Sequence, residues 1–182
     1  FETSMVALPF TRGRKPYEQV AFQFSAHTLH KDGRMEHHEW IDTNRGVFPN
    51  YEFVRQLKAV LEKDDGTIFK YSAHENTVLN QIKTQMLDDN ESKYGDLIEW
   101  IETITSWDEG GVKGSGYRNM VDLLQMVRKY YYHPDMGGSN SIKKVLPAVM
   151  TGDAIKKKYS KALDFGTHLK GRVLWELNPE TG

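Results

Sequence analysis

An Asp32-Gly33 pair between two runs of strand-forming residues constrains the fold of this chain more than any other short feature. The first run covers residues 20–29, and the second covers residues 35–41. Asp-Gly is a preferred sequence for the tight turn of a β-hairpin. The pattern therefore predicts two paired antiparallel strands early in the chain.

After the hairpin, apolar residues recur at three- and four-residue intervals, which is the spacing of amphipathic helices. A first helix is predicted over residues 49–63, where Pro49 suits the first turn. Residues 67–72 are typical of a short strand. Two further helices are predicted, one beginning near Glu75 and one ending near Trp107.

The C-terminal half alternates predicted loops with short helices. Residues 108–116 are rich in glycine and predict a mobile loop. A third helix is expected up to His133, and Ser141 is expected to cap a short helix that Pro147 ends or kinks. Residues 173–177 predict a final strand. Strands and helices in this order indicate an α/β fold with a mixed sheet.

The composition indicates a packed globular domain without a membrane span. The chain has 182 residues, 38% of them hydrophobic and 12% aromatic, with a formal charge of −1, so we expect one domain over residues 1–182. The absence of Cys excludes disulfides and thiolate zinc sites and fits a cytoplasmic location. No run approaches the ~20 apolar residues of a membrane span, so no membrane partner is expected.

Both ends of the chain look interrupted. Phe1 begins inside what reads as a strand, and the predicted strand at 173–177 runs into a turn with no partner after it. We therefore expect a fragment of a longer polypeptide with flanking domains, although a processed natural terminus is the alternative.

Positive charge is concentrated towards the C-terminus. Residues 1–140 carry 16 Lys/Arg against 21 Asp/Glu, whereas residues 141–182 carry 8 against 4. Ser141, Lys143 and Lys144 open a predicted helix there, and they are candidates for contacts with the phosphates of nucleic acid. A solvated helix face is the alternative interpretation of such a lysine-rich segment.

Three adjacent tyrosines, at residues 130–132, end the third predicted helix. Aromatic rings in such a position can stack on bases. Alternatively, the three rings straddle the boundary between the core and the surface.

Three acidic residues occupy positions where α/β proteins bind ligands. Glu2 ends the predicted first strand, Glu75 stands where a strand passes into a helix, and Asp122 lies near a helix start. Carboxylates gathered at strand ends suit hard cations such as Mg²⁺ or Mn²⁺. Two such ions activate water and stabilise the leaving oxygen in phosphodiester cleavage. The alternative for each acid alone is a helix cap or an exposed carboxylate.

Two short motifs resemble those of DEDD-type 3′–5′ exonucleases, the proofreading branch of the ribonuclease-H-like fold. Residues 1–3 resemble the end of the Asp-Phe-Glu-Thr first motif, and residues 71–79 resemble the second motif, with Glu75 in place of its acid. The resemblance implies a ribonuclease-H-like mixed sheet flanked by helices, with the Phe1 strand beside the hairpin. It also implies Glu2 and Glu75 as ligands of Mg²⁺ or Mn²⁺. The first-motif Asp and the last metal-binding acid are expected outside the chain.

The same resemblance places Asp122 after the second motif. There it is expected to cap backbone N–H groups or to support the metal site, with direct ligation as the less favoured role.

Two longer stretches, residues 15–25 and 131–148, resemble a bacterial family described only as a domain of unknown function and related to these exonucleases. The resemblance implies a metal-dependent nuclease that hydrolyses phosphodiester bonds of DNA or RNA, in the manner of a 3′–5′ exonuclease. The alternative is a non-catalytic nucleic-acid-binding or scaffold module of a larger DNA-processing protein.

Overall fold

The computed structural model describes residues 1–160, so the strand predicted at 173–177 lies outside the described residues. The chain divides into two compact units, residues 1–122 and residues 123 onward. The first unit contains β1 (Glu2–Met5), β2 (Gln19–Leu29), β3 (Met35–Ile41), α1 (Asn50–Leu61), β4 (Phe69–Lys70), α2 (His74–Ile104), β5 (Ser106–Glu109), β6 (Val112–Ser115) and β7 (Val121–Asp122).

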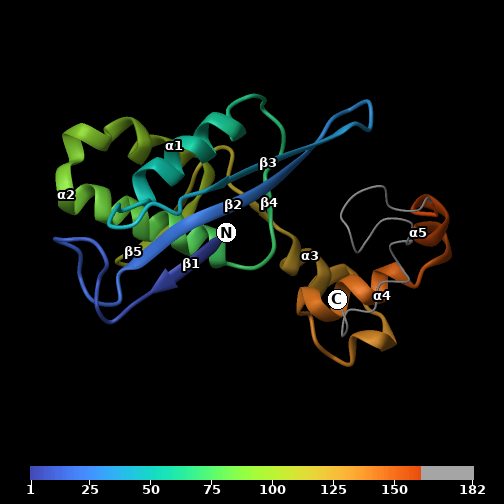
Figure 1. The fold of residues 1–182 in the computed structure, drawn as a ribbon. Coiled ribbons are helices and arrows are strands. Elements are labelled where there is room, and N and C mark those ends of the chain that lie inside the picture. Colours follow the sequence, from blue (N-terminus) through green and yellow to red (C-terminus); the bar gives the residue numbers. More distant parts are fainter. Residues whose placement is uncertain (161–182) are drawn as a thin grey trace. The chain divides into compact units, whose positions relative to one another are not determined.

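The predicted hairpin is present, and the predicted first strand lies beside it. The strands form a sheet in the order β1-β2-β3, with both neighbouring pairs antiparallel (Figure 1). Leu29 pairs with Met35 across the turn that contains Asp32 and Gly33. The α/β class predicted from the sequence is therefore confirmed. The predicted single mixed sheet is not, because the described strands form separate small sheets and the parallel pair β4–β7 is not joined to β1-β2-β3.

A β-bulge interrupts the pairing of β1 with β2. Thr3 pairs with Ala21 and Glu2 pairs with Gln23, so Phe22 is the extra residue. The bulge shifts the alternation of β2 by one position. Ala21 and Phe24 are consequently both buried, although an uninterrupted strand would place them on opposite faces.

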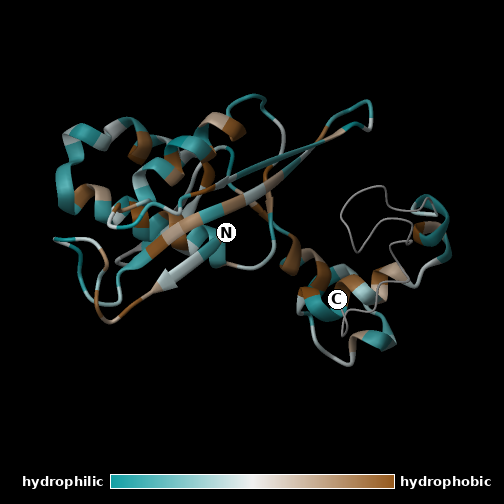
Figure 2. Ribbon diagram, in the orientation of Figure 1, coloured by the Kyte–Doolittle hydropathy of each residue, from teal (hydrophilic) through white to brown (hydrophobic). Residues whose placement is uncertain are grey.

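Helices α1 and α2 cover one face of this sheet and close the core (Figure 1). Phe24 lies edge-on to Phe53 of α1 at 5.6 Å between ring centroids, and it stacks on Trp40 of β3 at 6.3 Å. Helix α2 contributes apolar residues at helical spacing to the core. They include Val78, Leu79, Ile82, Met86, Leu97 and Ile101. Figure 2 colours the ribbon by the hydropathy of each residue.

Helix α2 contains the two helices that the sequence predicted, which meet at Asn90. Asn90 has an extended backbone (φ −173°, ψ 92°) that breaks the helical path. Its Oδ1 accepts hydrogen bonds from the Lys93 N–H at 3.1 Å and from Ser92 Oγ at 2.8 Å. Asn90 therefore caps the second half of α2.

The glycine-rich segment at residues 108–116 is not a loop, which corrects the sequence prediction. Strands β5 and β6 pair as an antiparallel hairpin, with Glu109 opposite Val112. Gly110 and Gly111 form the two-residue turn with φ of 61° and 86°, as a type I′ turn requires. The glycines mark a tight turn between strands.

Farther along, β7 pairs in parallel with β4. Strand β4 covers only two residues of the strand predicted at 67–72.

The second unit contains α3 (Leu123–Tyr130), the short 3-10 helix η1 (Pro134–Met136), α4 (Ile142–Met150) and α5 (Asp153–Lys158). Its core cluster contains Met136, Val145 and Ala148, with Val127, Tyr131 and Val149 packed against it. Pro147 lies inside α4, which continues to Met150, so of the two predicted effects, an end or a kink, Pro147 does not end the helix.

Candidate functional site

Glu75 lies in the first turn of α2, where the helix dipole favours a negative charge. Its side chain is 23% exposed, and Oε1 lies 3.9 Å from the Phe1 amino nitrogen. The other oxygen, Oε2, is buried and accepts no hydrogen bond from the described residues. The carboxylate is thus largely withdrawn from water beside the start of β1.

Glu2 follows Phe1 on β1 and is exposed. The Phe1 ring packs into the core, edge-on to Phe53 at 4.9 Å. Because side chains alternate along a strand, Glu2 leaves β1 on the side opposite to the Phe1 ring. The bulge in the β1–β2 pairing falls directly beside Glu2. Bulges are common next to active sites, where they redirect a side chain.

Asp122, the last residue of β7, fastens the segment that leads into α2. Its Oδ1 accepts the Ser72 backbone N–H at 2.8 Å, and its Oδ2 lies 3.6 Å from Lys70 Nζ. Lys70 Nζ also donates to the Ser72 carbonyl at 2.7 Å. Ser72 has φ +78°, a left-handed conformation that costs energy for a residue with a side chain. The clamp formed by Lys70, Ser72 and Asp122 therefore holds a strained turn just before Glu75.

The described carboxylates do not form a preformed protein cage for a metal ion. In the part of the chain that the structure describes, no group of three or more His, Asp or Glu side chains is arranged to hold a metal. Mg²⁺, however, keeps several waters and is often bound by one or two carboxylates together with substrate phosphates. The orphaned Oε2 of Glu75 provides one donor of that kind. Glu2 lies on β1, one residue from the Phe1 nitrogen that Glu75 approaches, and no contact joins the Glu2 and Glu75 side chains among the described residues.

Ser141, Lys143 and Lys144 lie in the second unit, at the start of α4, and all three are exposed. Ser141 occupies the N-cap position with an extended backbone, but its side chain makes no capping hydrogen bond. Its backbone N–H donates to Ser139 Oγ at 3.2 Å.

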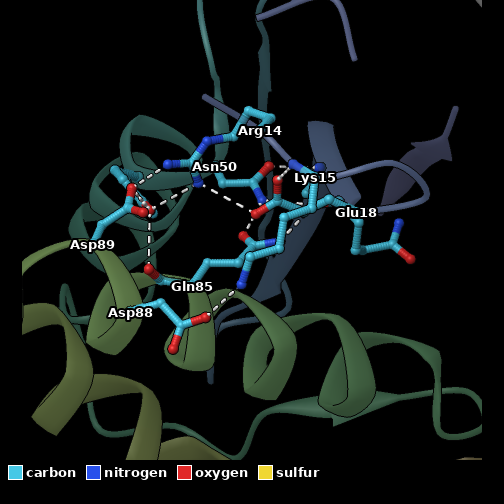
Figure 3. Close-up of polar contacts among 10 residues, drawn as sticks. Arg14, Lys15, Glu18, Asn50, Gln85, Asp88 and Asp89 are labelled. Carbon is cyan, nitrogen blue, oxygen red and sulfur yellow. Dashed lines mark hydrogen bonds and ion pairs between the residues drawn. The ribbon is translucent and has the colours of Figure 1, made fainter. Parts of the chain in front are cut away.

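A buried polar cluster in the first unit was missed by the sequence analysis (Figure 3). Asn50 is completely buried; its Oδ1 accepts the Ala21 N–H at 2.8 Å, and its Nδ2 donates to the Gln19 carbonyl at 2.9 Å and to Gln85 Oε1 at 2.6 Å. Gln85 Nε2 donates to the same carbonyl at 2.9 Å. These bonds connect β2, α1 and α2, so the cluster is structural.

A second set of contacts fastens the segment before β2 to α1 and α2 (Figure 3). Arg14 pairs with Asp89 and with Glu18, and Lys15 Nζ lies 2.9 Å from Asp88. Tyr51 donates to Asp89 Oδ2 at 2.5 Å. Residues 15–25, which carry the family resemblance, thus include Lys15, which pairs with Asp88 of α2, and Gln19, whose carbonyl accepts hydrogen bonds from α1 and α2.

The contacts of Asp89 shift the pKa values in this cluster. Burial acts to raise the pKa of Asp89, but hydrogen bonds from Tyr51 and Arg14 outweigh it and hold that pKa below its usual value. Burial, followed by the hydrogen bond to Asp89, raises the pKa of Tyr51 well above 10. The carboxylate is therefore ionised and the phenol neutral near pH 7.

The fold and the site define a mixed α/β protein with an acidic candidate site beside its first strand. The chain belongs to the family described as "Domain of unknown function (DUF2779)", whose model matches residues 1–141. No curated protein and no solved structure matched in the other two comparisons. Among the described helices, none combines the length and the apolar character needed to cross a membrane.

Proposed function

We propose that this chain is a ribonuclease-H-like nuclease domain that uses Mg²⁺ or Mn²⁺ to hydrolyse phosphodiester bonds of DNA or RNA, in the manner of a 3′–5′ exonuclease. Glu2 and Glu75 are the proposed ligands, and Asp122 is a positioning residue. The observation that carries the proposal is the buried, unpartnered Oε2 of Glu75 beside the start of β1.

An orphaned carboxylate oxygen favours a cation. Withdrawing a charged oxygen from water without a hydrogen-bond donor is costly, and a nearby cation offsets that cost. The metal ions, when bound, supply an activated water and stabilise the leaving oxygen. This chain's own contribution is to hold the Glu75 carboxylate in place, through the first turn of α2 and the clamp on Ser72.

The arrangement of elements supports the ribonuclease-H-like part of the proposal. An antiparallel sheet begins with β1 and the β2–β3 hairpin, helices follow, and a later parallel pair brings Asp122 to the entry of α2. The bulge beside Glu2 is a further feature expected of a site at this strand.

The test measures metal binding and cleavage separately. Mn²⁺ binding is followed by calorimetry and electron paramagnetic resonance, and cleavage with end-labelled single-stranded DNA and RNA at several divalent metals. Glu75→Gln and Glu2→Gln keep the side-chain shape and remove the charge, so both should weaken Mn²⁺ binding and abolish metal-dependent cleavage. Glu39→Gln, at an exposed position of β3, is the matched control.

Equal Mn²⁺ binding by Glu75→Gln and by the unaltered chain would contradict the proposed site. Oligonucleotide binding without cleavage at any divalent metal would favour the second candidate function, a non-catalytic nucleic-acid-binding or scaffold module. That candidate is supported by one observation: Lys143 and Lys144 are both exposed at the start of α4, where they can contact phosphates.

A further inference from the structure

The two units carry opposite charge. Residues 1–122 contain 14 Lys/Arg against 20 Asp/Glu, whereas residues 123–160 contain 7 against 2. The described part of the second unit is therefore strongly basic, with a net charge of +5. A basic region of this kind favours a negatively charged partner.

The cations of the second unit are not neutralised by its own carboxylates. In the first unit, many basic residues form ion pairs, such as Arg14 with Asp89, Lys15 with Asp88 and Arg118 with Asp64. Over residues 123–160, none of the Lys or Arg side chains forms an ion pair with a carboxylate of the described chain. These basic residues are Arg128, Lys129, Lys143, Lys144, Lys156, Lys157 and Lys158.

The three tyrosines divide between core and surface. Tyr131 packs against the Met136 cluster, whereas Tyr130 is 72% and Tyr132 is 79% exposed. Lys129 Nζ lies 5.0 Å from the centroid of the Tyr130 ring. Anchoring of Tyr131 thus fixes two exposed rings on either side of it, next to Arg128 and Lys129.

We propose that these four exposed residues, Arg128, Lys129, Tyr130 and Tyr132, form a tyrosine–cation surface that binds single-stranded nucleic acid. Exposed rings next to unpaired cations match a polymer that alternates flat bases with phosphates, since bases stack on the rings and phosphates contact the cations. In a duplex the bases are stacked on one another, so they are not free to stack on the tyrosine rings. This inference rests on the proposed nuclease function and specifies that its nucleic acid is single-stranded. Binding of the strand itself requires neither metal nor cleavage.

The experiment uses the whole chain in EDTA and follows the fluorescence anisotropy of a labelled oligo-dT or oligo-U strand. Tyr130→Ala combined with Tyr132→Ala should weaken binding roughly 5- to 100-fold for each ring removed from the stack, while Tyr→Phe at both positions should retain it. Arg128→Gln and Lys129→Gln should each reduce the salt dependence of binding by about one phosphate contact.

Matched controls come from exposed residues of the first unit. Tyr117 is 89% exposed and the Lys113 side chain is 82% exposed, so Tyr117→Ala and Lys113→Gln should bind the strand as the unaltered chain does. Glu39→Gln, at an exposed position of β3, should also bind normally. Because the assay contains EDTA and follows no cleavage, loss of strand binding in the tyrosine variant and loss of Mn²⁺ binding in a Glu75 variant are separate results.

Three results would overturn the inference. The first is an absence of strand binding at low salt, and the second is equal affinity in the Tyr130→Ala/Tyr132→Ala variant. The third is tight binding to vesicles rich in phosphatidylserine without binding to either oligonucleotide. Circular dichroism melts of each variant verify that the exposed substitutions leave the fold intact.

Discussion

Asn50 shows how one buried side chain joins distant parts of the first unit. All of its amide hydrogen-bonding groups face β2 or α2, and none of its surface is exposed. A sequence signal for this role is lacking, because the partners Gln19 and Gln85 lie 31 and 35 residues away and share no periodic spacing with it. Glu2 and Glu75, in contrast, could be singled out from strand and helix boundaries.

Replacing Asn50 with Ala should lower the free energy of unfolding by about 2 kcal/mol, because the buried Ala21 N–H then loses its acceptor. Denaturant titration measures the change. Asn44→Ala, at an exposed position, is the control and should be nearly neutral. A wild-type value for Asn50→Ala would show that the amide network does not hold these elements together.

Asp89 should make the stability of the first unit depend on pH. Its pKa is lowered in the folded state by hydrogen bonds that outweigh burial, so the ionised carboxylate stabilises the fold above the unfolded pKa of about 4. That stability is lost as the pH falls through the lowered pKa. Asp89→Asn should therefore destabilise the protein at pH 7, and the difference from wild type should shrink below about pH 4.

Denaturation midpoints at pH 7 and pH 3 check this expectation for Asp89. Asp65→Asn, at an exposed carboxylate, is the control. A difference between Asp89→Asn and wild type that stays constant between the two pH values would contradict the assigned role.

At the scale of elements, two glycines of the first unit differ in whether the surrounding atoms leave space for a side chain. A Cβ on Gly116 would lie 2.1 Å from the backbone oxygens of Glu102 and Thr103, whereas a Cβ on Gly95, within α2, would meet no atom within 4 Å. The sequence does not distinguish them, because the close approach at Gly116 comes from the end of α2 packing on the segment after β6.

Gly116→Ala should therefore lower the free energy of unfolding by about 3 kcal/mol, since backbone atoms must move to admit the methyl group. Gly95→Ala should raise it by about 0.5–1 kcal/mol through helix propensity. Thermal and denaturant unfolding compare the two variants. The same sign for both would refute this packing.

The kink in α2 depends on the cap at Asn90. Asn90→Ala removes the acceptor for the Lys93 N–H and should cost about 1 kcal/mol, while Asn90→Asp should retain the cap. Far-UV circular dichroism melts measure both. If Asn90→Ala melts with wild-type stability, the second half of α2 is held by packing alone.

Element boundaries could be predicted where apolar periodicity is strong, as in α1 and both halves of α2. The β5–β6 hairpin could not, because Gly110 and Gly111 give the same composition signal in a tight turn as in a loop. Pro147 was expected to end or kink its helix because proline lacks an N–H, and α4 continues past it to Met150.

At the scale of the whole molecule, the two units have separate cores. The Asn50 network and the Phe24 cluster belong to the first unit, and the Met136 cluster belongs to the second. Length and composition do not report where contacts are concentrated, so the sequence did not predict this division into two units. The division coincides with the change in charge between residues 1–122 and 123–160.

Asn50→Ala should therefore loosen one unit alone. Hydrogen exchange measured by mass spectrometry should increase in β2, α1 and α2 and stay unchanged in α4, because no described contact of Asn50 extends beyond the first unit. A parallel increase in α4 would show that the two units unfold together.

The parallel pairing of β4 with β7 has a consequence for the order in which the chain acquires its structure. The contact between Ser72 and Asp122 spans 50 residues, so it carries the entropy of closing a long loop. Helix α2 and the β5–β6 hairpin form from nearby residues and shorten that loop first. On the ribosome, the turn before Glu75 cannot be clamped until Asp122 has left the exit tunnel. The candidate site is thus completed only when synthesis of the whole first unit has ended.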